Sequence, residues 1–128
     1  MKKYFQAILF LFIPALSLAQ VPASDWPMFR GKSDLSGSLK NELPSNPDLL
    51  WSLPTGSKSQ SSPVISEGLL FFGNDKGTFF ALGIDKKISW TYDAGSAVTA
   101  PPLVYGDKVF FGSDNGLFIA LEKSSGKP

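Results

Sequence analysis

The chain has 128 residues, of which 43% are hydrophobic and 18% charged, and its formal net charge is +1. It has no cysteine, which excludes disulfides, thiol nucleophiles and thiolate metal sites, and no histidine, the usual general base and metal ligand near neutral pH. The charges are scattered and form no phosphate-tracking stripe, so we expect no nucleic-acid partner. Lys86 and Lys87 are interpreted as a solvated turn.

Residues 1–19 are typical of a secretory signal peptide, with two early lysines, an apolar core and small residues ending at Ala19. The apolar run is too short for a membrane anchor and Pro14 breaks it. Gln20 stands where a lipoprotein needs a cysteine. We therefore expect an exported protein, periplasmic or extracellular, that is not a lipoprotein and has no membrane span after cleavage.

Residues 20–48 are predicted to form an N-terminal lead and an irregular connection, because residues 32–48 are rich in Ser, Asn, Pro and charge. Within this stretch Trp26, Phe29 and Arg30 are candidates for a recognition surface, although packing against the following domain is the favoured interpretation. The third segment, residues 49–128, opens with a predicted strand at Leu49–Leu53.

The third segment contains an internal repeat. Residues 51–89 align with residues 90–128 at an offset of 39 without a gap and share 12 identities. A period near 40 with several short β runs predicts the blades of a β-propeller. The identical pairs are Trp51/Trp90, Gly56/Gly95, Ser57/Ser96, Pro63/Pro102, Phe71/Phe110, Phe72/Phe111, Gly73/Gly112, Asp75/Asp114, Gly77/Gly116, Phe79/Phe118, Ala81/Ala120 and Leu82/Leu121.

Each repeat divides into short strands that are apolar on both faces, as a sheet stacked between two others requires. In the first repeat the strands are expected at about 63–66, 69–72, 78–82 and 88–92. Glu67–Gly68 and Gly106–Asp107 are expected to turn the first hairpin of each repeat. In the second hairpin, glycine supplies positive φ and Asp75 is expected to accept from backbone N–H groups two residues on.

The predicted fold class is therefore all-β, a partial β-propeller. It comprises one complete four-stranded blade at 63–92, three strands of a second at 101–121, and the early, ring-closing outer strand at Leu49–Leu53. Incomplete blades leave exposed edges and apolar faces. We interpret the sequence as the N-terminal part of a longer propeller, whose last blade would pair with the early strand.

Residues 51–128 resemble the PQQ-like (quinoprotein-type) β-propeller repeat family, and the BamB-like proteins within it. The segments that carry the resemblance are Ser62-Pro63-Val64, the stretch from Gly73 to Leu82 and Trp90 in the first copy, and Pro102-Leu103-Val104, the stretch from Gly112 to Glu122 and Ser125-Gly126 in the second. Residues 25–31 are similar to the family's lead-in. Gly83 replaces the usual Asp and Lys86–Lys87 replaces Thr-Gly, so this corner is expected to be less regular.

The resemblance implies that Trp51 and Trp90 dock between blades. Asp75 and Asp114 offer one carboxylate per loop, which favours a turn over a calcium site. Six phenylalanines are predicted to be core: Phe71, Phe72, Phe79, Phe110, Phe111 and Phe118. The remaining repeat positions are interpreted as architecture, and no residue is predicted to be catalytic, cofactor-binding or metal-binding.

The favoured hypothesis is a non-catalytic binding or scaffold propeller of the cell envelope, whose partners are envelope proteins and whose role is similar to outer-membrane assembly. Two alternatives remain. One is the N-terminal fragment of a PQQ-dependent alcohol or sugar dehydrogenase, which would need PQQ and calcium; the other is a ligand-sensing propeller domain. Because repeats identify fold better than function, the question of an enzyme stays open at this point.

Overall fold

The computed structural model describes residues 25–38 and 44–128, so the predicted signal peptide at 1–19 lies outside the described residues. Within these ranges every regular element is a strand, as the sequence predicts. No helix there is long and apolar enough to cross a membrane. The strands are β1 (Val64–Ser66), β2 (Leu69–Gly73), β3 (Thr78–Gly83), β4 (Ile88–Asp93), β5 (Leu103–Tyr105), β6 (Lys108–Gly112) and β7 (Phe118–Glu122).

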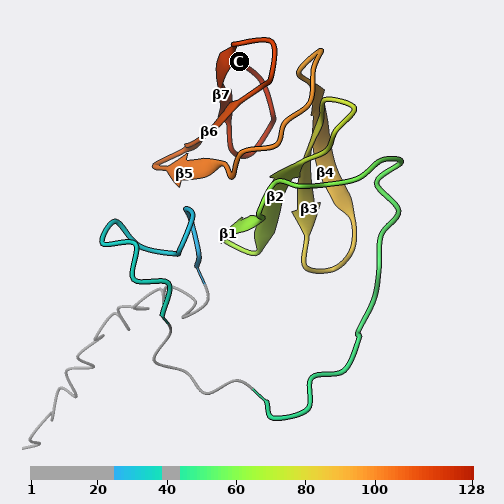
Figure 1. Ribbon diagram of the computed structural model, residues 1–128, viewed down its shortest axis with the longest axis vertical. Coiled ribbons are helices and arrows are strands. Elements are labelled where there is room, and N and C mark those ends of the chain that lie inside the picture. The colour runs from blue at the N-terminus through green and yellow to red at the C-terminus, as the bar shows by residue number, and fades with distance from the viewer. Residues whose placement is uncertain (1–24, 39–43) are drawn as a thin grey trace, which may run out of the picture.

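The strands form two antiparallel sheets in sequence order, β1-β2-β3-β4 and β5-β6-β7. The two sheets lie side by side, with the chain passing from β4 to β5 between them (Figure 1). This arrangement confirms one complete blade and three strands of a second. The strand bounds of the first blade agree with the expected ones to within one residue.

The first hairpin of each blade is closed by different turn chemistry. In the first blade Glu67 and Gly68 both have positive φ, 50° and 77°, as a type I′ turn requires. In the second blade Gly106 alone has positive φ, 61°, as in a type II′ turn. Both turns match the right-handed twist of their strands, so the expected positions are confirmed.

The early outer strand predicted at Leu49–Leu53 is not formed. Among the described residues no strand lies beside this segment, and a strand needs a partner to satisfy its backbone groups. Leu49 and Leu50 are 86% and 84% exposed. From Trp51 to Thr55 half-buried and exposed residues alternate, which is typical of an extended chain lying with one side on a surface.

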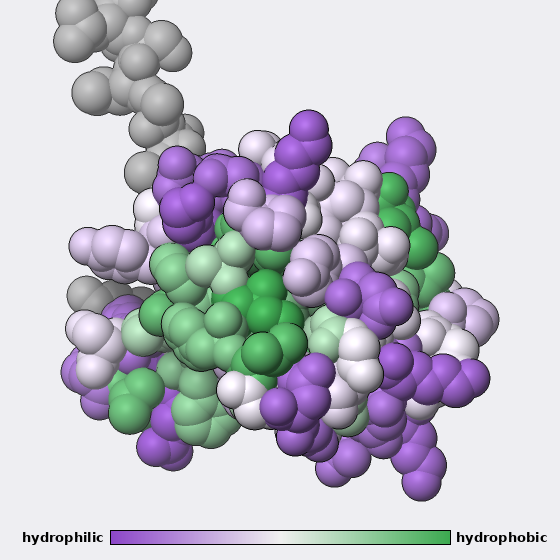
Figure 2. Space-filling view, turned by 90° about the horizontal axis from the view of Figure 1, so that it is seen from above, coloured by the Kyte–Doolittle hydropathy of each residue, from purple (hydrophilic) through white to green (hydrophobic). Residues whose placement is uncertain are grey.

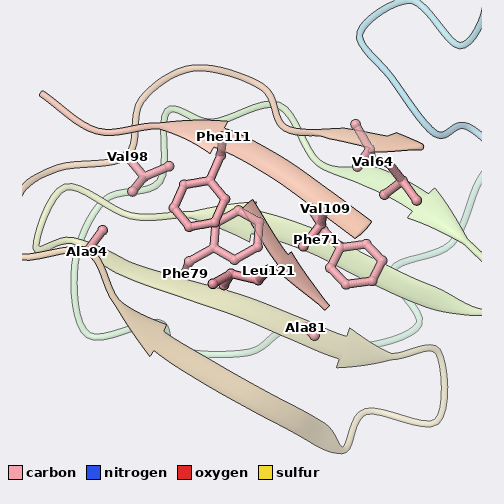
Figure 3. Packing of buried hydrophobic residues seen from close by; sticks show 10 residues of the cluster. Val64, Phe71, Phe79, Ala81, Ala94, Val98, Val109, Phe111 and Leu121 are labelled. Carbon is pink, nitrogen blue, oxygen red and sulfur yellow. The ribbon is translucent and has the colours of Figure 1, made fainter. Parts of the chain in front are cut away.

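The core lies between the two sheets (Figure 3). Phe79 of β3 and Phe111 of β6 stack with ring centroids 3.8 Å apart and planes within 4°. Around this pair the first blade contributes Val64, Phe71 and Ala81, and the second contributes Val104, Val109 and Leu121. The core is therefore an interface between blades rather than the interior of either one.

The six phenylalanines predicted to be core divide by which face they occupy. Phe71, Phe79 and Phe111 are buried between the sheets, which confirms the prediction for them. Phe72 and Phe110 are half-buried. Phe118 was expected to be core, and this is wrong for the described chain: it is 77% exposed, because no sheet covers the outer face of the second blade.

If the blade interface is the core, Phe79→Ala should lower the free energy of unfolding by about 3–5 kcal/mol, since it leaves a cavity opposite Phe111. The measurement is urea unfolding of the full chain. Phe29→Ala is the matched control, because Phe29 is 52% exposed and outside the interface, and we expect its effect to stay within about 0.5 kcal/mol. Equal losses for both variants would contradict this assignment of the core.

Candidate functional site

Trp90 joins the first blade to the end of the second. It lies on β4, and its Nε1 donates a hydrogen bond of 3.0 Å to the backbone oxygen of Lys123, just after β7. Its ring packs near Phe71 and Phe79, with centroids 5.9 and 6.1 Å away. Trp90 thus packs on its own blade through its ring and reaches the second blade through its Nε1, an arrangement in keeping with the expected docking position.

Gly126 makes room for the docked tryptophan. Its φ is +70°, and a Cβ built on it would lie 2.6 Å from the Trp90 ring. A side chain at this position would displace the indole, because real Cβ contacts are essentially never that short. The Ser125-Gly126 turn, which is part of the family pattern, is therefore the site on which the Trp90 ring packs.

The corresponding corner of the first blade is built differently. Its β3–β4 turn is one residue shorter, and a register shift occurs between Ala81 and Leu82, which confirms the expected irregularity. Lys86 takes the place of Gly126: its φ is +72°, and its N–H bonds to the oxygen of Gly83 as that of Gly126 bonds to Glu122. The first blade thus has the Cβ of Lys86 at the position where the second blade has Gly126 and the Trp90 indole above it.

Trp51 was expected to dock as Trp90 does, and the described structure shows a different position. The Trp90 ring lies over Gly126, where there is no Cβ. Lys86, at the equivalent position of the first blade, has a Cβ, so a tryptophan ring cannot lie over that turn in the same way. Trp51 is half-buried and instead lines a cavity on the first blade. Trp51 and Trp90 occupy the same repeat position, but the open space that Gly126 leaves for Trp90 has no counterpart for Trp51. The two tryptophans therefore have different environments.

This cavity has a volume of about 330 Å³ and lies between the first sheet and the segment that leads into β1. Its lining residues are Trp51, Leu53, Thr55, Ser59, Ser61, Pro63, Leu70, Phe72 and Leu82. None of them is ionisable. The three hydroxyl groups already donate to backbone oxygens, those of Ser57, Gly73 and Ala100. The cavity therefore presents an apolar wall, which suits an apolar side chain and offers no acid or base.

The loop after β2 is closed by an asparagine rather than by the aspartate next to it. The Asn74 Oδ1 accepts from the backbone N–H groups of Lys76 and Thr78, at 3.1 and 2.9 Å, and its Nδ2 donates to the oxygen of Thr55. Asp75 was expected to make such local bonds. Instead its carboxylate accepts from the Gln60 side chain, so it ties the loop to the segment before the blade.

The second blade repeats this tie with different residues. Asp114 accepts from Thr99, the repeat equivalent of Gln60, and its N–H bonds to the oxygen of Ala97. Asn115, two positions after the equivalent of Asn74, donates to the oxygen of Ala94, which corresponds to Thr55. The hydrogen bond from an asparagine to the preceding segment's backbone is therefore present in both blades, although the asparagine occupies a different repeat position in each. Sequence alignment alone did not reveal it, because the asparagines are not in register.

The glycines and alanines at identical repeat positions differ in what they touch. Cβ atoms built on Gly73 and Gly77 would lie 2.3 Å from Val98 and 2.7 Å from the backbone oxygen of Ser96, both in the segment that leads into the second blade. Gly77 also has φ +86°, as expected for a turn glycine, whereas Gly73 does not have positive φ.

At most of the equivalent repeat positions in the second blade the residues have fewer close neighbours than in the first. Gly112 and Gly116 have no close neighbour beyond their own loop. Ala120 is half-buried, whereas its equivalent Ala81 is fully buried. The prolines show the opposite difference, since Pro102 is buried and Pro63 lines the cavity at the surface.

The aromatic cluster near the N-terminus joins the innermost strands of both blades. Trp26 exchanges two backbone hydrogen bonds with Ile65 of β1, at 2.8 and 2.9 Å, and Val104 of β5 donates to the oxygen of Pro27. The segment lies beside β1 and β5 in Figure 1. The Trp26 ring lies over Gly31, where a Cβ would meet it at 2.6 Å. Packing of Trp26 against the propeller is thereby confirmed.

The same segment is held at its start by Asp25, whose carboxylate accepts from the N–H of Glu67 and from Ser66. Of the three candidates for a recognition surface, Phe29 and Arg30 are exposed and Trp26 is half-buried.

Charged groups lie outside the cavity. Lys123 is buried and pairs across the blades with Glu67 at 2.8 Å, and Lys108 pairs with Glu122. The hydrogen bond to Glu122 raises the pKa of Lys108. The pKa of Asp34 and that of Asp85 are lowered, each mainly by a backbone N–H two residues on. In the described ranges no three acidic, cysteine or histidine side chains come together as metal ligands.

If Trp90 needs the open space at Gly126, Gly126→Ala should destabilise the chain more than Gly106→Ala. Both glycines have positive φ, but only a Cβ at Gly126 meets a ring, since Gly106 has nothing within 4 Å. We expect about 1 kcal/mol of loss at Gly106 and at least about 1 kcal/mol more at Gly126, measured by urea unfolding. Equal losses of unfolding free energy in the two variants would show that the Trp90 indole does not pack against Gly126.

Lys86→Gly should raise the free energy of unfolding by up to about 1 kcal/mol, because glycine adopts φ near +72° without the strain of a lysine. Lys87→Gly is the control: Lys87 lacks positive φ, so glycine there should only add chain entropy to the unfolded state and lower stability slightly. A loss at Lys86 as large as that at Lys87 would contradict the described corner.

Comparison with known proteins identifies the repeat. Residues 43–128 match the sequence family described as outer membrane protein assembly factor BamB. Among solved structures, BamB from Moraxella catarrhalis is similar with a TM-score of 0.54 and 23% identity, over 59% of this chain and 24% of that one. A europium-containing methanol dehydrogenase is also found, with a TM-score of 0.47 and 22% identity, over 52% and 14% of the two chains.

The chain thus spans about a quarter of the BamB structure that it matches. No curated protein matches the chain. The family match extends over most of the sequence and coincides with the two blades and the cavity. The chain belongs to the PQQ-like β-propeller repeat family described as outer membrane protein assembly factor BamB.

Proposed function

We propose that this protein is exported and acts as a non-catalytic binding or scaffold propeller of the cell envelope, holding other envelope proteins during outer-membrane protein assembly. The family match supports the class of role, since its description names outer-membrane assembly. The observation that carries the proposal is the cavity. It is apolar, its hydroxyls are already engaged, and it has no ionisable lining residue, so it is suited to binding and not to proton transfer.

The surface around the blades also favours binding. Phe29 is 52% exposed on the N-terminal segment, and Tyr105 is 77% exposed on β5. Aromatic side chains that stay accessible on a rigid support are the usual anchors of protein interfaces. Export is proposed from residues 1–19, and the partners are proposed to be envelope proteins.

The dehydrogenase alternative requires PQQ and calcium, and the described residues do not fit them. Calcium takes several oxygen ligands at short range, and no three acidic residues gather in these ranges. An anionic quinone needs cationic or hydrogen-bonding partners, which the apolar cavity does not offer. We therefore propose no cofactor for this segment and assign no chemical step.

The proposal is tested in the full-length protein by placing a photo-crosslinking residue at Phe29, in cells, and identifying the captured proteins. We expect crosslinks to outer-membrane proteins or to the machinery that assembles them. Lys127, which is exposed at the far end of the second blade, is the control position. Capture of the same proteins from both positions would show that the crosslinks are not specific.

The enzymatic alternative has its own measurement. Full-length protein incubated with PQQ and Ca²⁺ should show no quinone absorbance after desalting and no oxidation of primary alcohols or aldose sugars. Bound quinone together with alcohol oxidation would overturn the proposed function.

A further inference from the structure

We propose that the N-terminal segment, residues 25–37, occupies the axis of the propeller and plugs its central channel, so that this chain and not a foreign ligand fills the channel beside the first two blades. The proposal is independent of the proposed function, which needs only that Phe29 stays accessible at one end of the channel. The segment lies outside the repeat, because the sequence Asp25–Gly31 has no counterpart at the offset of 39. A propeller likewise has many blades but a single axis.

The stacking of blades accounts for the apolar faces of the sheets. Seen from above, on the side of the second sheet, hydrophobic residues gather near the centre of the molecule and hydrophilic ones surround them (Figure 2). In a propeller each sheet packs between two neighbouring sheets, so a face of this kind is covered by a blade. The inner edge of a sheet, by contrast, faces no blade. Its backbone groups need another partner, either water or a further segment of chain.

The position of the axis follows from the way in which the two sheets converge. Blades radiate from a central channel, so their backbones are closest at the inner strands. Among the described strands, β1 and β5 are the only two of different sheets that have Cα atoms within 8 Å of each other. In Figure 1 the two sheets converge toward these strands, and the N-terminal segment, drawn in blue and cyan, lies on that side. The axis therefore lies beside β1 and β5, where the segment is.

The segment bonds to the inner edges of both blades. β1 uses one edge to pair with β2, and β5 uses one edge to pair with β6. On its opposite edge, Ile65 of β1 exchanges backbone hydrogen bonds of 2.8 and 2.9 Å with Trp26. On the opposite edge of β5, the N–H of Val104 donates to the oxygen of Pro27 at 2.7 Å. A proline suits this position, because it accepts the bond and has no N–H of its own to satisfy. Two consecutive residues thus join the two sheets at the axis.

Beyond these two residues the segment forms a closed loop. The N–H of Gly37 donates to the oxygen of Arg30 at 3.1 Å, which brings the two ends of the loop together. Arg30 and Leu35 have positive φ, 60° and 53°, a conformation that residues other than glycine keep only where the surrounding structure holds them. The Trp26 ring packs over Gly31 inside the segment. A closed and packed loop fills more of a channel than a single extended chain does.

Side chains also fix the start of the segment. The carboxylate of Asp25 accepts from the N–H of Glu67 at 3.0 Å and from the hydroxyl of Ser66 at 3.4 Å, at the turn between β1 and β2. Glu67 in turn pairs with Lys123 of the second blade at 2.8 Å. The segment is therefore attached to the first blade by backbone and side chains together, and it begins at a turn that contacts the second blade.

The first test uses the absence of native cysteine. Trp26 lies opposite Ile65 in an antiparallel bridge. Asp25 therefore lies opposite Ser66, with Cα atoms about 4.5 Å apart, as a disulfide requires. In the full-length protein Asp25→Cys/Ser66→Cys should close an intramolecular disulfide under mild oxidation. Asp25→Cys/Ser59→Cys is the control and should close few, because Ser59 bonds to the last residue of β2, at the opposite end of that strand. Equal yields, or none in the first variant, would overturn the position of the segment.

The second test measures whether the segment fills the channel. A specific protease site is inserted after Ser45 of the full-length protein, in an exposed part of the connection, and is cut after folding. We expect the N-terminal piece to stay bound in gel filtration and a labelled peptide of residues 25–37 to replace it slowly. Uncut protein should take up at least about tenfold less peptide, because its own tethered segment holds the same place at a high effective concentration.

The control for this second test is the same peptide with Trp26→Ala, which lacks the ring that packs over Gly31 and should bind at least about tenfold more weakly. Release of the N-terminal piece directly after cleavage would overturn the proposal. Equal uptake by cut and uncut protein, or equal binding of the two peptides, would also overturn it, since neither is compatible with a channel that this segment fills.

Discussion

The stacking of Phe79 on Phe111 is the interaction on which the rest of the fold depends. A small antiparallel sheet with two apolar faces is not stable in water by itself, because one face or both would remain exposed. Here each blade supplies half of a shared core, and the two rings meet at its centre. The linker between blades, the docking of Trp90 and the N-terminal segment all serve to keep the two sheets close enough for that contact.

Strands and blades could be predicted from the sequence because their signals are local. Gly77 and Gly68 mark turns by needing positive φ, and the 39-residue period sets the number of hairpins. The environment of a repeat position could not be predicted in this way. Phe79 and Phe118 share one position, yet one is core and the other exposed, because only one has a sheet in front of it. Burial is a property of neighbours and not of the pattern.

The candidate site was mostly missed by sequence reasoning. The cavity is formed by the segment before β1 leaning on the first sheet, and no motif marks it. One signal was available: the Thr-Gly corner of the family is replaced at Lys86, which removes the seat for a docked tryptophan and leaves Trp51 to line the cavity. The hydrogen bonds of Asn74 and Asn115 to the preceding segment were also hidden, because the two residues are out of register.

Side chains on the facing sides of the two blades pair with one another and form the buried core, whereas Phe118 on the outer face of the second blade has no such partner among the described residues. The central pair, Phe79 and Phe111, therefore carries the test. A double-mutant cycle with Phe79→Ala and Phe111→Ala, measured by urea unfolding, should give a coupling energy of about 1 kcal/mol or more. Additive effects of the two substitutions would show that the blades do not stabilise each other through this contact.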